Sequence, residues 1–168
     1  QLQGLFCLFA DDNQIMELPD SICKLSQLQR LSLDNNQLAH LPNQLVQLSH
    51  LEELHLHRNL LEEVPEGLWG MRHLKVLSIG SNPLGNLPHT ISQLNQLEAL
   101  YIHEMGATQL PDSLCQLSKL QTLDAAHNQL TSLPERLGDL KNLSQFLYLS
   151  NNQLSVLPDS LRQLKKLR

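Results

Sequence analysis

The sequence repeats itself with a period of 23 residues, and this period limits the possible folds more than any other feature. An Asn column and a Pro column both advance by this step along the chain. The last copy comes one residue late, because one residue is inserted between Leu143 and Leu147. The Asn column consists of Asn13, Asn36, Asn59, Asn82, Asn128 and Asn152, with Met105 in its fifth place. Such self-similarity is typical of a chain that stacks one small structural unit on the next.

As a consensus, the seven copies read L-x-x-L-x-L-x-x-N-x-L-x-x-L-P-x-x-L-x-x-L-x-x. The alternation near its start predicts a short strand with one buried face, so that Leu31 and Leu33 point inward in the second copy. The segment that follows, such as 41–48, has Leu at helical spacing with Pro near its first turn, which predicts a short helical segment. Stacked copies therefore give a parallel sheet with one solvated face.

A single L-x-x-L-x-L would carry little weight, but seven copies in register span essentially the whole chain. The pattern resembles the leucine-rich repeat family. Its length and its L-P-x-x-[LI] segment are similar to the intracellular group, which includes Ras-associated and Scribble-type scaffolds and many bacterial leucine-rich proteins. The resemblance implies protein recognition by an α/β solenoid, a horseshoe with a concave parallel β-sheet and short helical or 3-10 segments on the convex side.

The domain organisation follows from the same repeats. We expect residues 1–168 to form a single domain of seven repeats, with a one-residue insertion in the last. The sequence has no linker and no low-complexity run. It also lacks a start Met and stops within a repeat, so we expect it to be a fragment of a longer protein.

The composition argues against two classes of partner. The chain has a formal net charge of −5, whereas a surface that follows nucleic-acid phosphates would need an excess of Lys and Arg. About a quarter of the residues are Leu, yet no apolar stretch approaches the roughly 18 residues of a membrane span. We therefore expect neither nucleic acid binding nor a membrane span.

The cysteines favour a reducing compartment. Cys23 and Cys115 occupy one column four repeats apart, which places them about 19 Å apart and far beyond the reach of a disulfide. Cys7 lies alone in another column, and neither end carries the Cys-rich cap that is usual in secreted leucine-rich repeats. We expect a cytoplasmic protein, or one that acts in the host cytoplasm if it is a bacterial effector.

The Asn column is predicted to be structural. Backbone groups at each strand exit are buried without ladder partners, and an Asn side chain offers one acceptor and two donors to satisfy them. In the fifth copy Met105, Gly106 and Ala107 break the pattern, and we expect the turn there to relax or to take up water. Two interpretations stay open: a tolerated local defect with Met as an adaptable filler, or an irregular turn beside the ligand-binding face.

The outward strand positions are not required by the fold, so their chemistry carries the information about partners. The first copies are acidic, the middle copies are rich in His and Arg, and Ser78, Gly80 and Ser81 form a shallow dip. Tyr and Arg are the residue types that most often anchor protein interfaces. The predicted partner-binding residues of the concave face are His55, His57, Arg58, Tyr101, His103, Asp124, His127 and Tyr148.

Some outward side chains also have neighbours of opposite charge on the next strand. Such pairs are typical of a solvated sheet face, and each contributes roughly 0–1 kcal/mol. The expected pairs are Arg30 with Glu53, Glu104 with His127 and Asp34 with His57.

No set of residues predicts catalysis or a bound metal. His55 and His57 share one strand face, but His103 is expected about 10 Å away across the Gly80 strand, and zinc needs three or four closely held ligands. No Ser–His–Asp or Cys–His set and no phosphate loop stands out. We therefore expect no enzyme activity in this segment, no metal and no cofactor.

The preferred interpretation is a protein–protein interaction module, in the manner of a signalling scaffold, that binds a protein partner through its concave face. One alternative is the substrate- or ligand-sensing arm of a larger signalling enzyme or bacterial effector, such as a kinase, GTPase or ubiquitin ligase. A second alternative is a purely structural spacer. Because a solenoid without caps exposes its Leu-rich core, self-association is also expected around Leu2, Leu5, Leu164 and Leu167.

Overall fold

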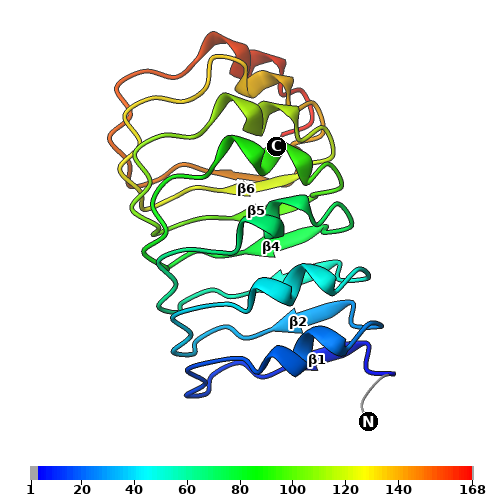
Figure 1. Ribbon diagram of the computed structural model, residues 1–168. Helices are drawn as coiled ribbons and strands as arrows, with labels where there is room; N and C mark the ends of the chain where they lie inside the picture. Colours follow the sequence, from blue (N-terminus) through cyan, green and yellow to red (C-terminus); the bar gives the residue numbers. More distant parts are fainter. Residues whose placement is uncertain (1–3, 168) are drawn as a thin grey trace.

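The computed structural model describes residues 4–167, and its seven strands form one parallel sheet in chain order. The strands are β1 Cys7–Phe9, β2 Arg30–Ser32, β3 Glu53–His55, β4 Val76–Ser78, β5 Ala99–Tyr101, β6 Thr122–Asp124 and β7 Phe146–Tyr148. The register keeps the sequence period, so that Leu31 pairs with Leu54 and Leu54 with Leu77. Figure 1 shows the copies stacked from the blue N-terminal end to the red C-terminal end.

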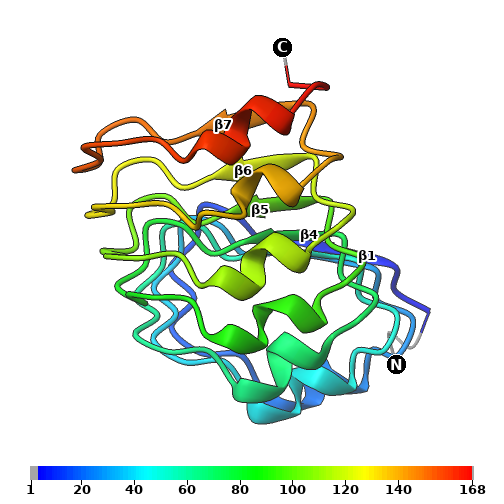
Figure 2. The same ribbon diagram turned by 90° about the horizontal axis from the view of Figure 1, so that it is seen from above.

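The return segments are short 3-10 helices. They are η1 Asp20–Lys24, η2 Asn43–Gln47, η3 Glu66–Gly70, η4 His89–Gln93, η5 Asp112–Gln116, η6 Leu137–Asp139 and η7 Asp159–Gln163. The N–H of Leu48 donates to the carbonyl of Leu45 at 3.1 Å, the i to i−3 bond that tightens such a turn. Figures 1 and 2 show strands and 3-10 helices on opposite sides of the stack. The predicted solenoid is confirmed.

The hydrophobic core lies between these two layers. Its strand side is formed by the central Leu of each inner strand, all fully buried: Leu31, Leu54, Leu77, Leu100 and Leu123. The return segments add Leu45, Leu68 and Leu114, which are equally buried. β1 and β7 have one neighbouring strand each, and their Leu8 and Leu147 are only partly buried. Each copy therefore buries its apolar face against its neighbours and against nothing else.

The described Leu residues that were predicted to be exposed at the ends are more buried than expected, although Leu157 in the last copy is exposed. Leu164 is buried, whereas Leu5 and Leu167 are partly buried against the core. Leu2 lies outside the described residues. Self-association through the ends stays a prediction.

Within residues 4–167, no helix is both long enough and apolar enough to cross a membrane.

The Asn side chains connect successive copies through backbone hydrogen bonds. Asn59 is typical, because its Oδ1 accepts the N–H of Leu38 at 3.0 Å and its Nδ2 donates to the carbonyls of Leu33 at 2.9 Å and Leu56 at 3.1 Å. The same arrangement recurs at Asn36, Asn82, Asn128 and Asn152. Asn13, in the first copy, is exposed and donates to carbonyls of its own turn. Each inner Asn thus satisfies backbone groups of two copies.

The residue before each position of the Asn column has a left-handed backbone. Its φ lies between 51° and 55° in all seven copies, at Asp12, Asn35, Arg58, Ser81, Glu104, His127 and Asn151. This conformation is uncommon outside glycine and marks the point where each copy leaves the sheet.

The turn around Met105 departs from the regular pattern. Met105 is buried but cannot accept the N–H of Leu84, which bonds instead to the carbonyl of Asn82 at 2.8 Å. The N–H of Gly85 donates forward to the carbonyl of Met105 at 2.9 Å. In the regular copies such bonds run backward, as from the N–H of residue 60 to the carbonyl of residue 38. The fifth copy therefore rearranges the turn of the copy before it.

Candidate functional site

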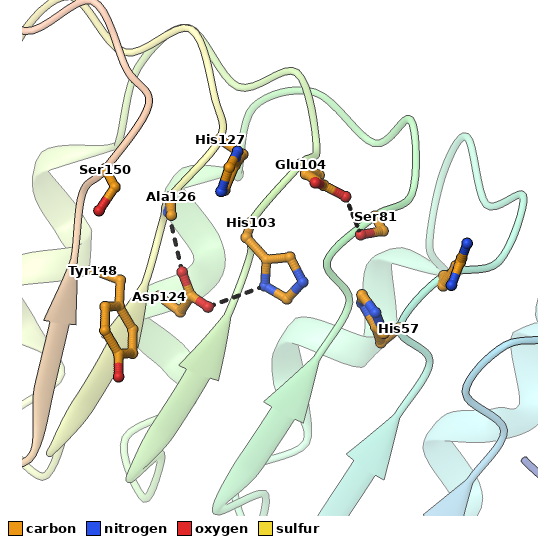
Figure 3. A pocket seen from close by; sticks show the side chains of 10 residues that line it. His57, Ser81, His103, Glu104, Asp124, Ala126, His127, Tyr148 and Ser150 are labelled. Atoms are coloured by element: carbon orange, nitrogen blue, oxygen red, sulfur yellow. Dashed lines mark hydrogen bonds and ion pairs between the residues drawn. The ribbon is translucent and has the colours of Figure 1, made fainter.

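The concave face is hollowed where strands β3 to β7 end. This concave hollow has a volume of about 640 Å³. Its lining consists of His57, Arg58, Ser81, His103, Glu104, Asp124, Ala126, His127, Tyr148 and Ser150. Figure 3 shows that these side chains come from successive copies and face one shared space.

Gly80 determines how the centre of the hollow is packed. A Cβ at Gly80 would lie 2.8 Å from Cε1 of His103, so the His103 ring occupies the space that any other side chain would fill. As a result, the rings of His57 and His103 meet across β4 with centroids 4.8 Å apart. The predicted separation of about 10 Å is wrong, because strand spacing alone ignores how far two rings can lean over a glycine.

His103 also contacts the next strand. Its Nδ1 lies 3.2 Å from Oδ2 of Asp124, an arrangement with the distance of an ion pair but without the alignment of a good hydrogen bond. The other oxygen of Asp124 accepts the N–H of Ala126 at 3.1 Å, which fixes the carboxylate in place (Figure 3). Both side chains are about four-fifths buried, with 22% and 19% of their side-chain surface exposed. The floor of the hollow is therefore a connected polar group and not a set of loose surface side chains.

His57 is held from two sides. Its backbone N–H donates to Oδ1 of Asp34 at 2.6 Å, and its Nδ1 lies 3.2 Å from the carbonyl of Gly80. Because a carbonyl only accepts, Nδ1 carries the hydrogen, which leaves Nε2 of the neutral ring as an acceptor. The predicted neighbourhood of Asp34 and His57 is confirmed, although the contact uses the backbone. Burial raises the pKa of the Asp34 carboxyl, and the bond from His57 N–H acts in the opposite direction.

The charged rim differs in part from the expectation. The predicted pair of Glu104 with His127 is wrong, because Glu104 accepts a hydrogen bond from Oγ of Ser81 at 2.7 Å, while His127 lies 3.1 Å from the amide of Asn151. The bond from Ser81 lowers the pKa of the Glu104 carboxyl. Glu104 and His127 each stand one residue before a position of the Asn column. Each turns toward a polar neighbour on the rim of the hollow.

The predicted pair of Arg30 with Glu53 is confirmed. Their guanidinium and carboxylate lie 2.6 Å apart, outside the concave hollow. The bond from Arg30 lowers the pKa of the Glu53 carboxyl even though partial burial of that carboxyl acts to raise it. This pair accounts for two outward side chains without a partner protein.

An aromatic wall stands at the C-terminal side of the hollow, and of its two residues Tyr148 lines the hollow whereas Phe146 lies outside the lining. The rings of Phe146 and Tyr148 are stacked, with centroids 5.3 Å apart and planes 9° from parallel. About half of each side chain remains exposed, at 50% and 44%. Phe146 was not among the predicted site residues, although an exposed Phe in an outward strand column is a signal that could have found it.

Six of the eight predicted partner-binding residues line the hollow, namely His57, Arg58, His103, Asp124, His127 and Tyr148. The other two lie beside it. His55 is near Glu53, with Nε2 and Oε2 3.6 Å apart, and Tyr101 is half-buried on β5. The predicted set lacked four lining residues, Ser81, Glu104, Ala126 and Ser150, which occupy the same outward columns of the repeat.

Among residues 4–167, no three His, Cys, Asp or Glu side chains come together in a way that could hold a metal ion.

Comparison with known proteins identifies the family. The family described as "Leucine-rich repeat region" matches residues 65–168, and "Leucine rich repeat" matches residues 8–61. The chain belongs to the leucine-rich repeat family. Members of this family generally serve as protein–protein interaction modules, and the repeat fold itself is typically non-catalytic. No curated protein matches the sequence.

Solved structures support the same conclusion. A leucine-rich repeat protein of Leptospira interrogans is 36% identical with a TM-score of 0.95, over 99% of this chain and 42% of that one. Internalin C2 of Listeria monocytogenes is 29% identical with a TM-score of 0.83, over 99% and 70%. The ectodomain of the Arabidopsis thaliana receptor kinase GASSHO1/SCHENGEN3 is 29% identical with a TM-score of 0.80, over 99% and 24%. The present chain thus spans less than half of the Leptospira chain and a quarter of the plant one.

Proposed function

We propose that this chain is a protein-binding module that grips a protein partner in the concave hollow. The observation that carries the proposal is the hollow itself, where His, Arg and Tyr side chains that the fold does not require gather around about 640 Å³. A protein of similar fold, the Arabidopsis receptor ectodomain, was solved in complex with CASPARIAN STRIP INTEGRITY FACTOR 2. His55 and Tyr101 extend the proposed surface beside the hollow.

The lining suggests the chemistry of the contact. The stacked rings of Phe146 and Tyr148 offer exposed apolar area at one side, which suits an apolar side chain of the partner. Arg58 is exposed at the other side, and within residues 4–167 no carboxylate forms an ion pair with it. A partner segment with an apolar residue and an acidic residue spaced across the hollow fits both sides.

The test is affinity capture with the immobilised chain, followed by measurement of Kd for each captured protein. The double variant Arg58→Ala with Tyr148→Ala removes both proposed contacts. We expect Tyr148→Ala alone to cost on the order of 2 kcal/mol of binding free energy, because buried Tyr side chains are frequent interface anchors. Arg72→Ala, an exposed Arg in the return loop after η3, is the matched control and should leave Kd unchanged. A partner that still binds the double variant, but no longer binds variants changed on the convex side, would disprove the placement of the binding site in the concave hollow.

A second candidate function is the sensing arm of a larger protein. It is favoured by the coverage of the similar structures, since this chain spans 42% of the Leptospira chain and 24% of the receptor kinase ectodomain. The two candidates are separated by assaying the full-length gene product for activity with and without the double variant. An activity that responds to partner only through an intact hollow would favour the sensing arm.

We further propose a reducing location, the cytoplasm or the cytoplasm of a host cell. All three cysteines are free, and two of them, Cys23 and Cys115, are buried. Burial, with a smaller contribution from Asp112, raises the pKa of the Cys115 thiol to about 11, so this thiol stays protonated and unreactive at neutral pH. The test is to trap free thiols chemically in intact cells and to measure whether the three cysteines are reduced. Oxidised cysteines would contradict the proposal.

A further inference from the structure

A second cavity lies at the edge where the fourth copy turns back, and it shares no lining residue with the concave hollow. Its volume is about 160 Å³. The apolar part of its lining comes from Val64, Trp69, Ile79, Leu84, Leu87 and Met105. The polar part of the lining comes from three exposed residues, Glu62, Glu63 and Asn86.

The cavity arises from the interrupted Asn column. In the regular copies the Leu two places after the Asn is fully buried, as at Leu38, Leu61 and Leu130. Leu84 holds this place in the fourth copy but is only partly buried. Its N–H has no Asn side chain to bond to, because Met105 occupies that position, and it bonds to the carbonyl of Asn82 instead. Leu84 and Met105 both line the cavity.

Two further residues at the cavity differ from the regular repeat. Pro83 has no N–H, so the fourth copy lacks the donor that residue 60 offers to the carbonyl of residue 38 in the copy before. Val64 stands in a column that is otherwise Leu, at Leu18, Leu41, Leu87, Leu110, Leu133 and Leu157, and is therefore one carbon short. The backbone and the side chains thus both contribute to the cavity.

The size and charge of the lining define what fits. An enclosed apolar cavity of about 150 Å³ holds a molecule the size of benzene, and the present cavity is of similar volume but is open to solvent. The face of an indole attracts a cation, and two carboxylates nearby add to that attraction while opposing an anion. Trp69 supplies the indole, and Glu62 and Glu63 supply the carboxylates.

We propose that this cavity is a binding site for a small organic ammonium ion with an apolar body of about one aromatic ring. The apolar body occupies the space between Val64, Leu84 and Met105, and the ammonium group lies toward Glu62 and Glu63. The site is separate from the concave hollow, so the proposal does not depend on partner binding in the hollow.

Trp69 gives a direct signal, because it is the only Trp in the chain and lines the cavity. Benzylamine is the probe, and benzyl alcohol is its neutral counterpart of nearly the same size. We expect a saturable change in Trp69 fluorescence with benzylamine, and binding about fivefold weaker for benzyl alcohol, as two solvated charge contacts allow. N-acetyltryptophanamide in the same titration corrects for quenching in bulk solution.

Two variants make the result specific. Val64→Phe fills the cavity and should abolish the saturable signal, whereas Val64→Leu restores the regular residue and should weaken binding less. Glu62→Gln with Glu63→Gln leaves the cavity but should bring the affinities for benzylamine and benzyl alcohol to within about twofold of each other, since the charge contacts are gone. Tyr148→Ala, in the concave hollow, should change neither affinity.

Three outcomes would overturn the proposal. The first is a fluorescence change with benzylamine that does not saturate in the unmodified chain. The second is equal affinity for benzylamine and benzyl alcohol. The third is an unchanged signal in Val64→Phe, provided that circular dichroism shows this variant to be folded.

Discussion

At the scale of single residues, the Asn column shows why one copy can do without its Asn. The carbonyls that an Asn at position 105 would bind are still satisfied, because Asn82 donates to the carbonyl of Ile79 at 3.0 Å and Asn128 to that of Ile102 at 2.9 Å. Only the N–H of Leu84 loses its partner, and it finds the carbonyl of Asn82 instead. The sequence revealed the break but not this rearrangement, because the new bonds use backbone groups that every residue carries.

The stability of two variants follows from this difference. Asn59→Leu should lower the free energy of unfolding by about 1–3 kcal/mol, because it leaves the N–H of Leu38 buried without a partner, while the carbonyl of Leu33 keeps its bond from Asn36. Met105→Asn should cost less or even stabilise, since it offers Leu84 the missing acceptor. Urea unfolding of both variants checks the order, and the reverse ranking would mean that the column is not what joins the copies.

Asp34 carries a charge that partial burial disfavours. Its pKa is raised in the folded chain, so the folded state holds the proton more tightly than the unfolded state, whose Asp titrates near pH ~3.9. Above the folded pKa the carboxylate therefore weakens stability, and this penalty disappears as pH falls below both values. Asp34→Asn keeps an acceptor for the N–H of His57 and should stabilise by less than about 1 kcal/mol at neutral pH.

Melting temperatures of the two proteins at pH 7 and near pH 3 check this expectation. The gap between them should close at the lower pH. A gap of the same size at both pH values would show that the charge of Asp34 is not the cause.

At the scale of strands and helices, the sequence predicts which residues share a column. It does not predict how far a side chain reaches toward the residues of other copies. The parallel register, the inward Leu and the 3-10 return segments all follow from the 23-residue period. The contact between His57 and His103 does not follow from this period, because it depends on how the two rings are oriented over Gly80, which the sequence does not specify. The wall of the second cavity escapes prediction for the same reason.

Packing between two 3-10 helices gives a test at this scale. A Cβ at Gly138 in η6 would lie 1.9 Å from the carbonyl oxygen of Ser160 in η7, which is backbone and cannot move aside cheaply. Gly138→Ala should therefore lower the free energy of unfolding by about 1–3 kcal/mol. Gly70 in η3 is the matched control, because the nearest atom to its added Cβ is a side-chain oxygen 4.0 Å away. Gly70→Ala should change stability by no more than about 0.5 kcal/mol in urea unfolding, and equal losses for both would refute the proposed close contact.

At the scale of the whole molecule, stability depends on neighbours. A copy in the middle of the stack packs against two others, and its strand Leu is fully buried, whereas β1 and β7 each have one partner strand. The concave hollow was foreseeable in outline, since all ten of its lining residues belong to columns that the repeat leaves free and six of them were predicted. Its extent toward Ser150 and its aromatic wall were not, because the depth of a surface depends on curvature accumulated over several copies.

Hydrogen exchange of the 168-residue chain should follow this distribution. We expect the backbone amides of β1 and β7 to exchange fastest among the strands, and those of β3 to β5 to be the most protected. Mass spectrometry of peptides from a timed exchange series resolves the copies. Uniform protection along the stack would mean that the chain unfolds as one unit rather than from its ends.

The left-handed residue at each strand exit has an evolutionary consequence. Four of the seven are Asp, Asn or His, which tolerate this backbone best, but Arg58, Ser81 and Glu104 are not, and all three line the concave hollow. On the proposed function, selection for foldability alone would favour Asn at these positions, and the Arg, Ser and Glu found there trade some stability for partner binding. Arg58→Asn should therefore raise the melting temperature while weakening partner binding. An Arg58→Asn variant whose melting temperature does not rise, or whose partner binding is unchanged, would contradict this trade-off.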